Sequence, residues 1–230
     1  MKPLTAREFR ASGYVVLSTF ETVNEIQDLR DEVIIAARKA QFSWTPDADS
    51  HPFFDVWVAG VDKVSDLAFK LSRSERVVGL AEELLGAPVV PLRSCYAASQ
   101  PRSQTPSPWH ADASRYAAHF GNLPALAICL PLSDVGPRAG GLQFLRGVRS
   151  IETTDEVCTP PHLDPVIPGS AARTVARTIT ARPGDAIAYH SYAPYRVDAN
   201  DTEQAAEFVV IAYRFSPYRH RFGSALSRGD

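Results

Sequence analysis

The first part of the chain carries apolar residues at helical spacing. Between residues 23 and 40 they recur every three or four positions, which predicts one buried stripe along a helix. Thr22 directly precedes this segment, and its hydroxyl suits the N-cap of a helix. The apolar residues of the stripe are Ile26, Leu29, Val33 and either Ala36 or Ala37.

Two further helices and one strand are predicted in the same region. Thr5 and Glu8 have the spacing of a capping box, which indicates a short helix. A third helix begins at Ser74 and ends at Gly86, because serine favours N-caps and glycine favours the end of a helix. Between them, residues 14–17 form an apolar, β-branched run that is typical of a strand.

From Val89 onward the pattern changes to short apolar segments that are separated by proline, glycine and aspartate. Such segments predict strands, and the proline-rich stretch 150–170 predicts a loop over them. Helices followed by strands indicate an α+β fold that is mainly β, an antiparallel barrel braced by N-terminal helices. We therefore predict a single domain, residues 1–230, with a helix-rich segment at residues 1–88 and a barrel core at residues 89–230. The predicted strands are 89–94, 125–132, 142–145, 173–180, 185–189 and 208–215.

Composition narrows the class of protein. A net charge of −2 gives no reason to expect a nucleic-acid partner, and no apolar run reaches the length of a membrane helix. The N-terminus lacks the apolar core of a signal peptide, so we expect a cytoplasmic protein. The three cysteines are widely spaced and odd in number, which excludes a disulfide framework and a cysteine-based zinc site. The sequence makes no prediction of the oligomeric state.

The most informative segment is PSPWHADASRY, residues 106–116. His110 and Asp112 are two residues apart, so on a strand their side chains point to the same face. One imidazole and one carboxylate are two of the three ligands of a facial triad for Fe(II), which leaves positions open for substrate and oxygen. By its spacing alone the motif is common, and a surface histidine beside a turn aspartate explains it equally well.

The context of the motif resembles a known family. WHAD is followed by ALAICLPLSDVGPRAGGLQFLRG, by PGDAIAYHSYAPYRVDAN and by EFVVIAYRF, and it is preceded by FRASGYVVLSTF. This order is similar to that of the phytanoyl-CoA dioxygenase family of Fe(II)- and 2-oxoglutarate-dependent oxygenases. The resemblance covers nearly the whole chain and implies a cupin-like double-stranded β-helix, a jelly-roll barrel. It also implies that His110 and Asp112 are the first two metal ligands.

Two positions depart from the family pattern. The second histidine ligand corresponds here to Tyr195, and the arginine that binds the cosubstrate corresponds to a position at or near Ala206. A neutral phenol is a poorer ligand for Fe(II) than an imidazole. A methyl group cannot replace the bidentate clamp that an arginine forms on a carboxylate. Fe(II) therefore remains a possible cofactor, whereas standard dependence on 2-oxoglutarate is doubtful.

Other residues could restore the missing functions. His190 lies five residues before Tyr195 and could be a third metal ligand if the strand bulges, although its odd offset places it on the opposite face of a regular strand. Arg214 on the last predicted strand is the first alternative for binding the cosubstrate, and Arg93 and Arg196 are others. A surface charge or an ion pair explains Arg214 equally well.

Four aromatic residues near the motif could line a substrate pocket, although core packing accounts for each of them as well. They are Trp109, Tyr116, Tyr189 and Tyr192.

Three functions remain open. The first is a divergent non-heme iron oxygenase that acts on a small organic molecule in specialised metabolism. The second is a redox-neutral cyclase, isomerase or lyase on the same fold, with His110, Asp112 and Tyr195 as acid–base groups. The third is a binding protein on an inactivated scaffold, since one fold hosts many functions.

Overall fold

The computed structural model describes residues 3–41, 54–112, 125–145 and 176–216. Helices α1 (Pro3–Ser12), α2 (Val23–Gln41), α3 (Asp66–Ser72) and α4 (Glu75–Leu85) all come from the first 85 residues of the chain, together with the short 3-10 helix η1 (Val61–Lys63). The predicted loop 150–170, Tyr116 and Cys158 lie outside the described residues. No helix among the described residues combines the length and the apolar character needed to cross a bilayer.

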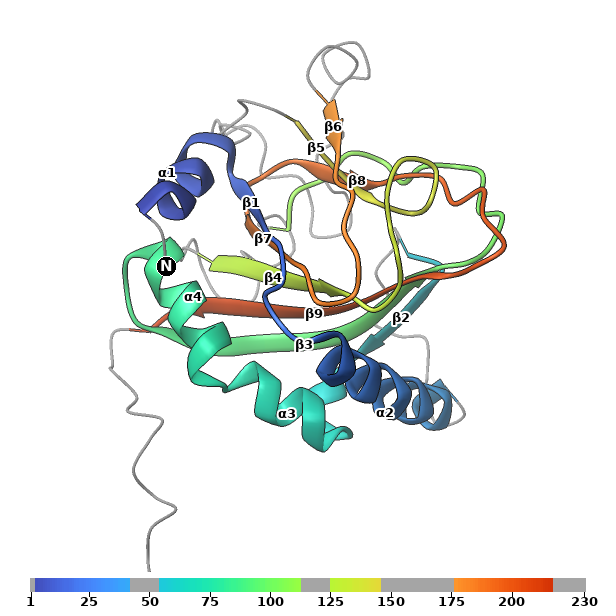
Figure 1. The fold of residues 1–230 in the computed structure, drawn as a ribbon, viewed down its shortest axis with the longest axis horizontal. Coiled ribbons are helices and arrows are strands. Elements are labelled where there is room, and N and C mark those ends of the chain that lie inside the picture. Colours follow the sequence, from blue (N-terminus) through green and yellow to red (C-terminus); the bar gives the residue numbers. More distant parts are fainter. Residues whose placement is uncertain (1–2, 42–53, 113–124, 146–175, 217–230) are drawn as a thin grey trace, which may run out of the picture.

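Two antiparallel sheets form the body of the protein. The larger has the order β1-β7-β4-β9-β3-β2 and the smaller the order β6-β5-β8. Figure 1 shows the small sheet above the large one, with α2 and α3 below and α4 at the left end. The strands are β1 (Tyr14–Leu17), β2 (Val56–Ala59), β3 (Val89–Ser99), β4 (Ala125–Pro131), β5 (Leu142–Leu145), β6 (Ala176–Thr178), β7 (Ala186–His190), β8 (Tyr195–Val197) and β9 (Ala206–Phe215).

Each face of the large sheet packs into its own apolar core. Along β9, Phe208 and Val210 belong to the core between the two sheets, whereas Val209, Ile211 and Tyr213 belong to the core beneath the helices. This alternation follows from the period of two along a strand. We call the face toward the small sheet the inner face and the face toward the helices the outer face.

The predicted helix signals are confirmed for α2 and α4. Thr22 and Glu25 form a reciprocal capping box, because the Glu25 amide donates to the Thr22 hydroxyl and the Thr22 amide donates to the Glu25 carboxylate. The Ser74 hydroxyl accepts from the Val77 amide, and Gly86 ends α4 in the left-handed conformation. Helix α1, in contrast, already begins at Pro3, so the prediction that Thr5 caps it is wrong.

Most predicted strands are present, but four elements of the described structure were not predicted. Strand β2, the 3-10 helix η1, helix α3 and strand β8 are 4, 3, 7 and 3 residues long. Segments this short contain less than two turns or two alternations, so periodicity carries little information about them. Strand β8 matters for function because it carries Tyr195.

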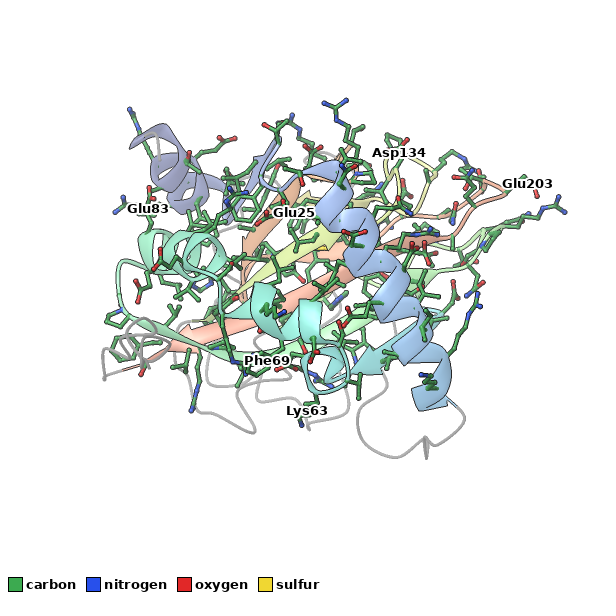
Figure 2. All side chains as sticks on the ribbon, turned by 60° about the horizontal axis from the view of Figure 1, so that its bottom comes forward. Glu25, Lys63, Phe69, Glu83, Asp134 and Glu203 are labelled. Carbon is green, nitrogen blue, oxygen red and sulfur yellow. The ribbon has the colours of Figure 1, made fainter. Side chains whose placement is uncertain are left out.

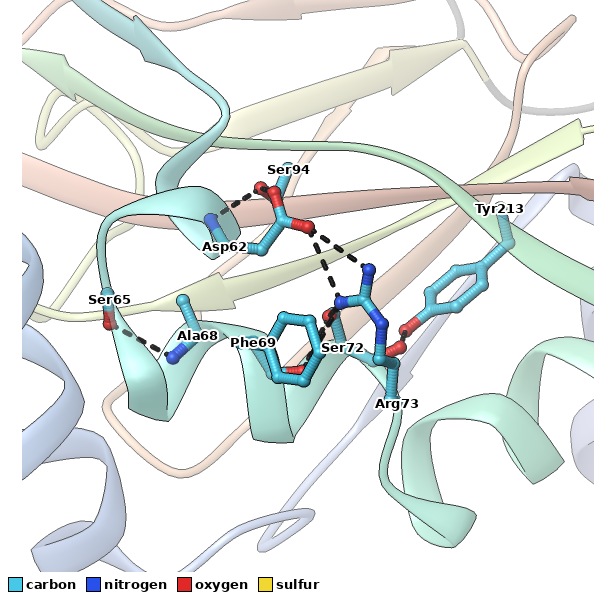
Figure 3. Close-up of polar contacts among 8 residues, drawn as sticks. All are labelled: Asp62, Ser65, Ala68, Phe69, Ser72, Arg73, Ser94 and Tyr213. Atoms are coloured by element: carbon cyan, nitrogen blue, oxygen red, sulfur yellow. Dashed lines mark hydrogen bonds and ion pairs between the residues drawn. The ribbon is translucent and has the colours of Figure 1, made fainter. Parts of the chain in front are cut away.

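Polar contacts tie the helical layer to the large sheet. The Asp62 carboxylate of η1 accepts from the Ser94 hydroxyl of β3 and pairs with Arg73 at the end of α3. The Tyr213 hydroxyl of β9 donates to the Ser72 carbonyl over 2.6 Å, as Figure 3 shows. Figure 2, turned so that the helices come forward, shows α2 and α3 lying across the sheet that these contacts anchor.

A buried carboxylate forms a second link between the layers. Glu207 of β9 is 6% exposed and accepts from the Tyr96 hydroxyl over 2.7 Å. Its other oxygen pairs with the Arg30 guanidinium of α2 over 2.6 Å. Burial and the neighbouring Glu207 carboxylate raise the pKa of Tyr96 far above its ordinary value. These contacts of Glu207 with β3 and α2 fix α2 on the sheet.

Candidate active site

The site lies where His110, just before Asp112, pairs with Tyr195 of β8. The His110 amide donates to the Tyr195 carbonyl over 2.9 Å, and the Tyr195 amide donates to the His110 carbonyl over 2.8 Å. A residue pair that exchanges both bonds places its side chains on one face. Accordingly, the imidazole and phenol ring centroids lie 4.2 Å apart, in the core between the two sheets.

The orientation of the His110 ring is fixed by its own backbone turn. Its Nδ1 lies 3.0 Å from the Pro108 carbonyl oxygen. A carbonyl can only accept, so Nδ1 carries the hydrogen of this bond and the neutral ring keeps its lone pair on Nε2. His110 is fully buried, which shields the ring from water. This arrangement prepares Nε2 as a ligand atom or as a base.

Asp112 is held by a phenol. The Tyr195 hydroxyl donates to Asp112 Oδ1 over 2.9 Å, and both side chains are buried. Burial raises the pKa of Tyr189, and the Asp112 carboxylate and a hydrogen bond with Tyr195 raise it further. Burial likewise raises the pKa of the Cys129 thiol, with a contribution from Asp112. Asp112 thus lies over the inner face of β4 and β7, beside protonated groups.

His190 lies elsewhere, which corrects the expectation that it completes the metal shell. It pairs with Leu126 in the register of β4 and β7, and Leu126 belongs to the core beneath the helices. Its ring lies 6.2 Å from the ring of Phe9 and 5.5 Å from that of Tyr192. The pairing is regular here, so His190 follows the inward Tyr189 on β7 and its side chain points to the outer face.

The four aromatic residues predicted to line a pocket do not all face the site. Tyr189 is on the inner face, with its ring centroid 4.9 Å from that of Tyr195. Trp109 is buried beneath the guanidinium of Arg196, 4.8 Å from the ring centroid, and precedes the inward His110. Tyr192 stacks on His190. The expectation that Trp109 and Tyr192 line the pocket is therefore corrected, and Tyr116 lies outside the described residues.

The position of the family's cosubstrate arginine is closed. Ala206 lies on the inner face of β9, 2% exposed. The backbone of Gly140 packs so tightly against it that a Cβ on Gly140 would overlap the Ala206 methyl group. Gly140 has a φ of +64° and is held by a hydrogen bond from its amide to the Ala199 carbonyl. An arginine at 206 would have to displace this turn, so 2-oxoglutarate does not fit here in the way the family pattern requires.

Two of the three alternative arginines lie on the inner face of the large sheet, and the third lies on the small sheet. Arg93 is paired with Ala212, an inner-face position, and its guanidinium lies 5.5 Å from the ring centroid of Trp57. Arg214 shares the parity of Val210 and Ala212 on β9, and so it also lies on the inner face. Arg196 donates to Gln143 on the other side of the small sheet from Tyr195. It therefore does not face the site.

The donor set fits Fe(II) as a site of two protein ligands. A neutral imidazole and a carboxylate both suit Fe(II). Within the described ranges, however, histidine, cysteine, aspartate and glutamate form no group of three that could hold a metal ion. His110 Nε2 and a carboxylate oxygen of Asp112 would hold the ion, and the phenol of Tyr195 lies beside both of them.

Comparison with known proteins agrees with this architecture. The family model for phytanoyl-CoA dioxygenase matches residues 9–207. The chain belongs to the phytanoyl-CoA dioxygenase family. A curated relative, L-proline trans-4-hydroxylase of Streptomyces griseoviridis, is 25% identical over 174 residues, or 67% of this chain. The alignment spans 65% of that relative's own length.

Solved structures confirm the double-stranded β-helix fold of this family member. The carbocyclase SnoK from nogalamycin biosynthesis has a TM-score of 0.76 at 18% identity, covering 94% of this chain and 84% of its own. The epimerase SnoN from the same biosynthesis gives 0.73 at 20%, covering 92% and 82%. EctD from S. alaskensis with bound iron gives 0.75 at 18%, covering 94% and 77%. At these low sequence identities, the similarity to the three structures supports the fold alone.

Sequence reasoning missed three features of the site. The Pro108 carbonyl that orients His110 gives no signal in a motif of side chains. The hydrogen bond from Tyr195 to Asp112 depends on a contact across 83 positions of the sequence. The closure of position 206 by Gly140 could have been suspected, since the adjacent glycines 140 and 141 indicate a close backbone approach.

Proposed function

We propose that this protein is a non-heme iron enzyme of small-molecule biosynthesis, with His110 and Asp112 as the protein ligands of Fe(II). The observation that carries the proposal is the fixed tautomer of the buried His110, whose Nδ1 donates to the Pro108 carbonyl. Metal-ligating histidines usually donate their other ring nitrogen in this way, which orients the ring. Membership of the oxygenase family supports the same ligand pair.

Each neighbouring residue has a defined task in this proposal. Tyr195 donates to one oxygen of Asp112, and the second oxygen of that carboxylate can serve as a ligand. The ring of Tyr189 packs against that of Tyr195, with centroids 4.9 Å apart, and holds it in place. The burial of all four side chains excludes water and strengthens electrostatic interactions within the site. When bound, Fe(II) supplies Lewis acidity and one-electron chemistry with molecular oxygen.

The substrate is a small organic molecule. L-proline trans-4-hydroxylase and the two nogalamycin enzymes act on small molecules by their names, and they share the family or the fold of this chain. The closed position at Ala206 supports a reaction that does not use 2-oxoglutarate in the family's usual pose.

A specific contact favours a second candidate function. The phenol of Tyr195 and the carboxylate of Asp112 are already hydrogen-bonded at 2.9 Å beside the imidazole of His110. These are the groups of a general acid and a general base, and they could catalyse a redox-neutral cyclisation, isomerisation or elimination. In that reaction Tyr195 would donate a proton while His110 Nε2 accepts one.

Anaerobic titration of the full chain with Fe(II) separates the two functions. The iron enzyme predicts one tightly bound Fe(II) per chain, measured by metal content after desalting, and loss of that iron in His110→Ala. His190→Ala is the matched control, since its ring lies on the outer face, and it keeps the iron. A wild-type chain that retains no iron overturns the proposal, and activity that persists in a chelator supports acid–base catalysis.

A further inference from the structure

A cavity of about 300 Å³ lies between α1, the C-terminal end of α4 and the end of β7. Figure 1 shows both helices at its left end, where they contact each other. The apolar side chains that line the cavity are Phe9, Leu84 and Leu85, and His190 of β7 lines it as well. A space of this volume is large enough for a small organic molecule.

The ring of His190 offers a hydrogen-bond donor to this cavity. Its Nδ1 accepts from the Tyr192 amide over 3.2 Å, because an amide N–H can only donate. The neutral ring therefore carries its hydrogen on Nε2, on the opposite edge from this turn. Burial lowers the pKa of His190 below 6.5, so the ring is neutral at pH 7.5. Among the described residues none forms a hydrogen bond with Nε2, which leaves this N–H to a ligand.

The donor is held in one orientation before any ligand arrives. The His190 ring lies between two aromatic rings, with centroids 6.2 Å from Phe9 and 5.5 Å from Tyr192. Its backbone is fixed to the turn after α1, because the His190 amide donates to the Gly13 carbonyl over 2.8 Å. A group that is already ordered loses little conformational entropy when it binds a partner.

The charges around the cavity select against an ion. Its two charged side chains, Arg10 and Glu83, have opposite signs and are both exposed to water. With His190 neutral, the lining has no net charge, so neither an anion nor a cation gains from it. At Gly86, which ends α4 with a φ of +71°, a Cβ would meet no atom within 4 Å, so the space there is open.

We infer that this cavity is a second small-molecule site, which binds an uncharged, largely apolar molecule through an acceptor oxygen on His190 Nε2. The site lies on the outer face of the large sheet, whereas the preceding residue, Tyr189, lies on the inner face beside Tyr195. It shares no residue with the site at His110 and Asp112. The inference therefore does not depend on the proposed function.

A pair of probes of equal shape tests the inference. Acetophenone carries a carbonyl oxygen where α-methylstyrene carries a CH₂ group, and both are titrated into the full chain labelled with ¹⁵N at histidine. Acetophenone should bind about fivefold more tightly, the gain expected for one hydrogen bond between uncharged groups, and should shift the Nε2 resonance of His190. Benzoate, the anionic analogue, should bind more weakly than acetophenone.

Two substitutions at the same position separate the donor from the rest of the ring. His190→Asn keeps an acceptor for the Tyr192 amide but has no atom at the place of Nε2, so it should lose the preference for acetophenone. His190→Gln extends its amide to that place and should retain the preference. His110→Ala is the control at the other site, and it should bind both probes as wild type does.

Equal affinity of wild type for acetophenone and α-methylstyrene, or no binding of acetophenone at millimolar concentration, overturns the inference. So does a preference that persists in His190→Asn or that disappears in His110→Ala. Tighter binding of benzoate overturns the assignment of an uncharged ligand. If His190→Asn fails to fold, Leu85→Trp decides, because it enlarges a half-buried side chain of the cavity wall and should abolish binding of both probes. Unchanged binding in that variant overturns the inference.

Discussion

His110 and Tyr195 are joined by two backbone hydrogen bonds, of 2.9 and 2.8 Å, that set their rings side by side. His110 and Tyr195 are therefore parts of one rigid pair. Tyr195 also holds Asp112, so a single residue fixes the two other members of the site. A change at Tyr195 consequently acts on both His110 and Asp112.

Removal of the Tyr195 hydroxyl should destabilise the fold. Tyr195→Phe keeps the ring contacts but takes away a hydrogen-bond donor to Asp112 Oδ1, which we expect to lower the free energy of unfolding by about 1.5–3 kcal/mol. Urea unfolding measures the change. Tyr192→Phe, at a half-buried position on the other side of the sheet, should change it by less than about 0.5 kcal/mol. Equal losses in the two variants would show that the bond to Asp112 contributes nothing.

Restoration of the family's histidine should strengthen metal binding. Tyr195→His places a second imidazole beside His110 and Asp112, which completes a two-histidine, one-carboxylate triad. We expect the affinity for Fe(II), measured by competition with a chelator, to rise by about tenfold or more. The added change His110→Ala should cancel the gain. An unchanged affinity in the single variant would mean that position 195 does not face the metal.

His190 should make the fold sensitive to mild acid. Burial lowers its pKa from 6.5, so the folded state disfavours the protonated ring. Its contribution to stability is fully present above about pH 6.5 and is lost as the pH falls through the lower folded pKa. His190→Phe should therefore show a smaller loss of stability between pH 7.5 and pH 5 in urea unfolding. A pH dependence identical to that of wild type would contradict this assignment.

The turn that closes position 206 should tolerate no side chain. Gly140→Ala adds a methyl group in a left-handed conformation and drives it into Ala206, so we expect a loss of about 1–3 kcal/mol in thermal or urea unfolding. Gly79→Ala is the control, because that site in α4 has open space and alanine favours helices by about 0.5–1 kcal/mol. A Gly140→Ala variant as stable as wild type would mean that position 206 is open.

The buried contacts of Glu207 with Arg30 and Tyr96 should stabilise the fold more than a surface ion pair does. Glu207→Gln removes the charge that Arg30 and Tyr96 share, and we expect a loss of about 1–3 kcal/mol, moderated because the Arg30 side chain is 35% exposed. Glu203→Gln breaks a pair with Arg102 in which both side chains are at least 70% exposed, and it should cost less than about 0.5 kcal/mol. Equal costs would refute the buried link.

The sequence predicted the elements whose patterns are long enough to repeat. Helix α2 shows its stripe over five turns, and β9 is an almost continuous apolar run within its ten residues. The motif at His110 and Asp112 and the absent histidine and arginine were also readable from the sequence. Strand β8 could not be predicted, because its three residues are too few to show a repeating pattern.

The geometry of the site could not be read from sequence because it depends on long-range register. The face on which His190 lies is decided by its pairing with Leu126, and the inward position of Arg93 depends on a bulge between Pro91 and Arg93. A shift by one residue at either place would exchange the faces.

Strand β1 has a practical consequence for work with this protein. It pairs with β7, the strand that carries Tyr189, and it is an edge strand of the large sheet. A shortened chain that starts after Leu17 would leave the backbone groups of β7 that face β1 unpaired, and exposed strand edges of this kind recruit other chains into aggregates. Truncation at the N-terminus should therefore stop before Gly13, and an affinity tag placed there needs a linker that does not compete for the same strand.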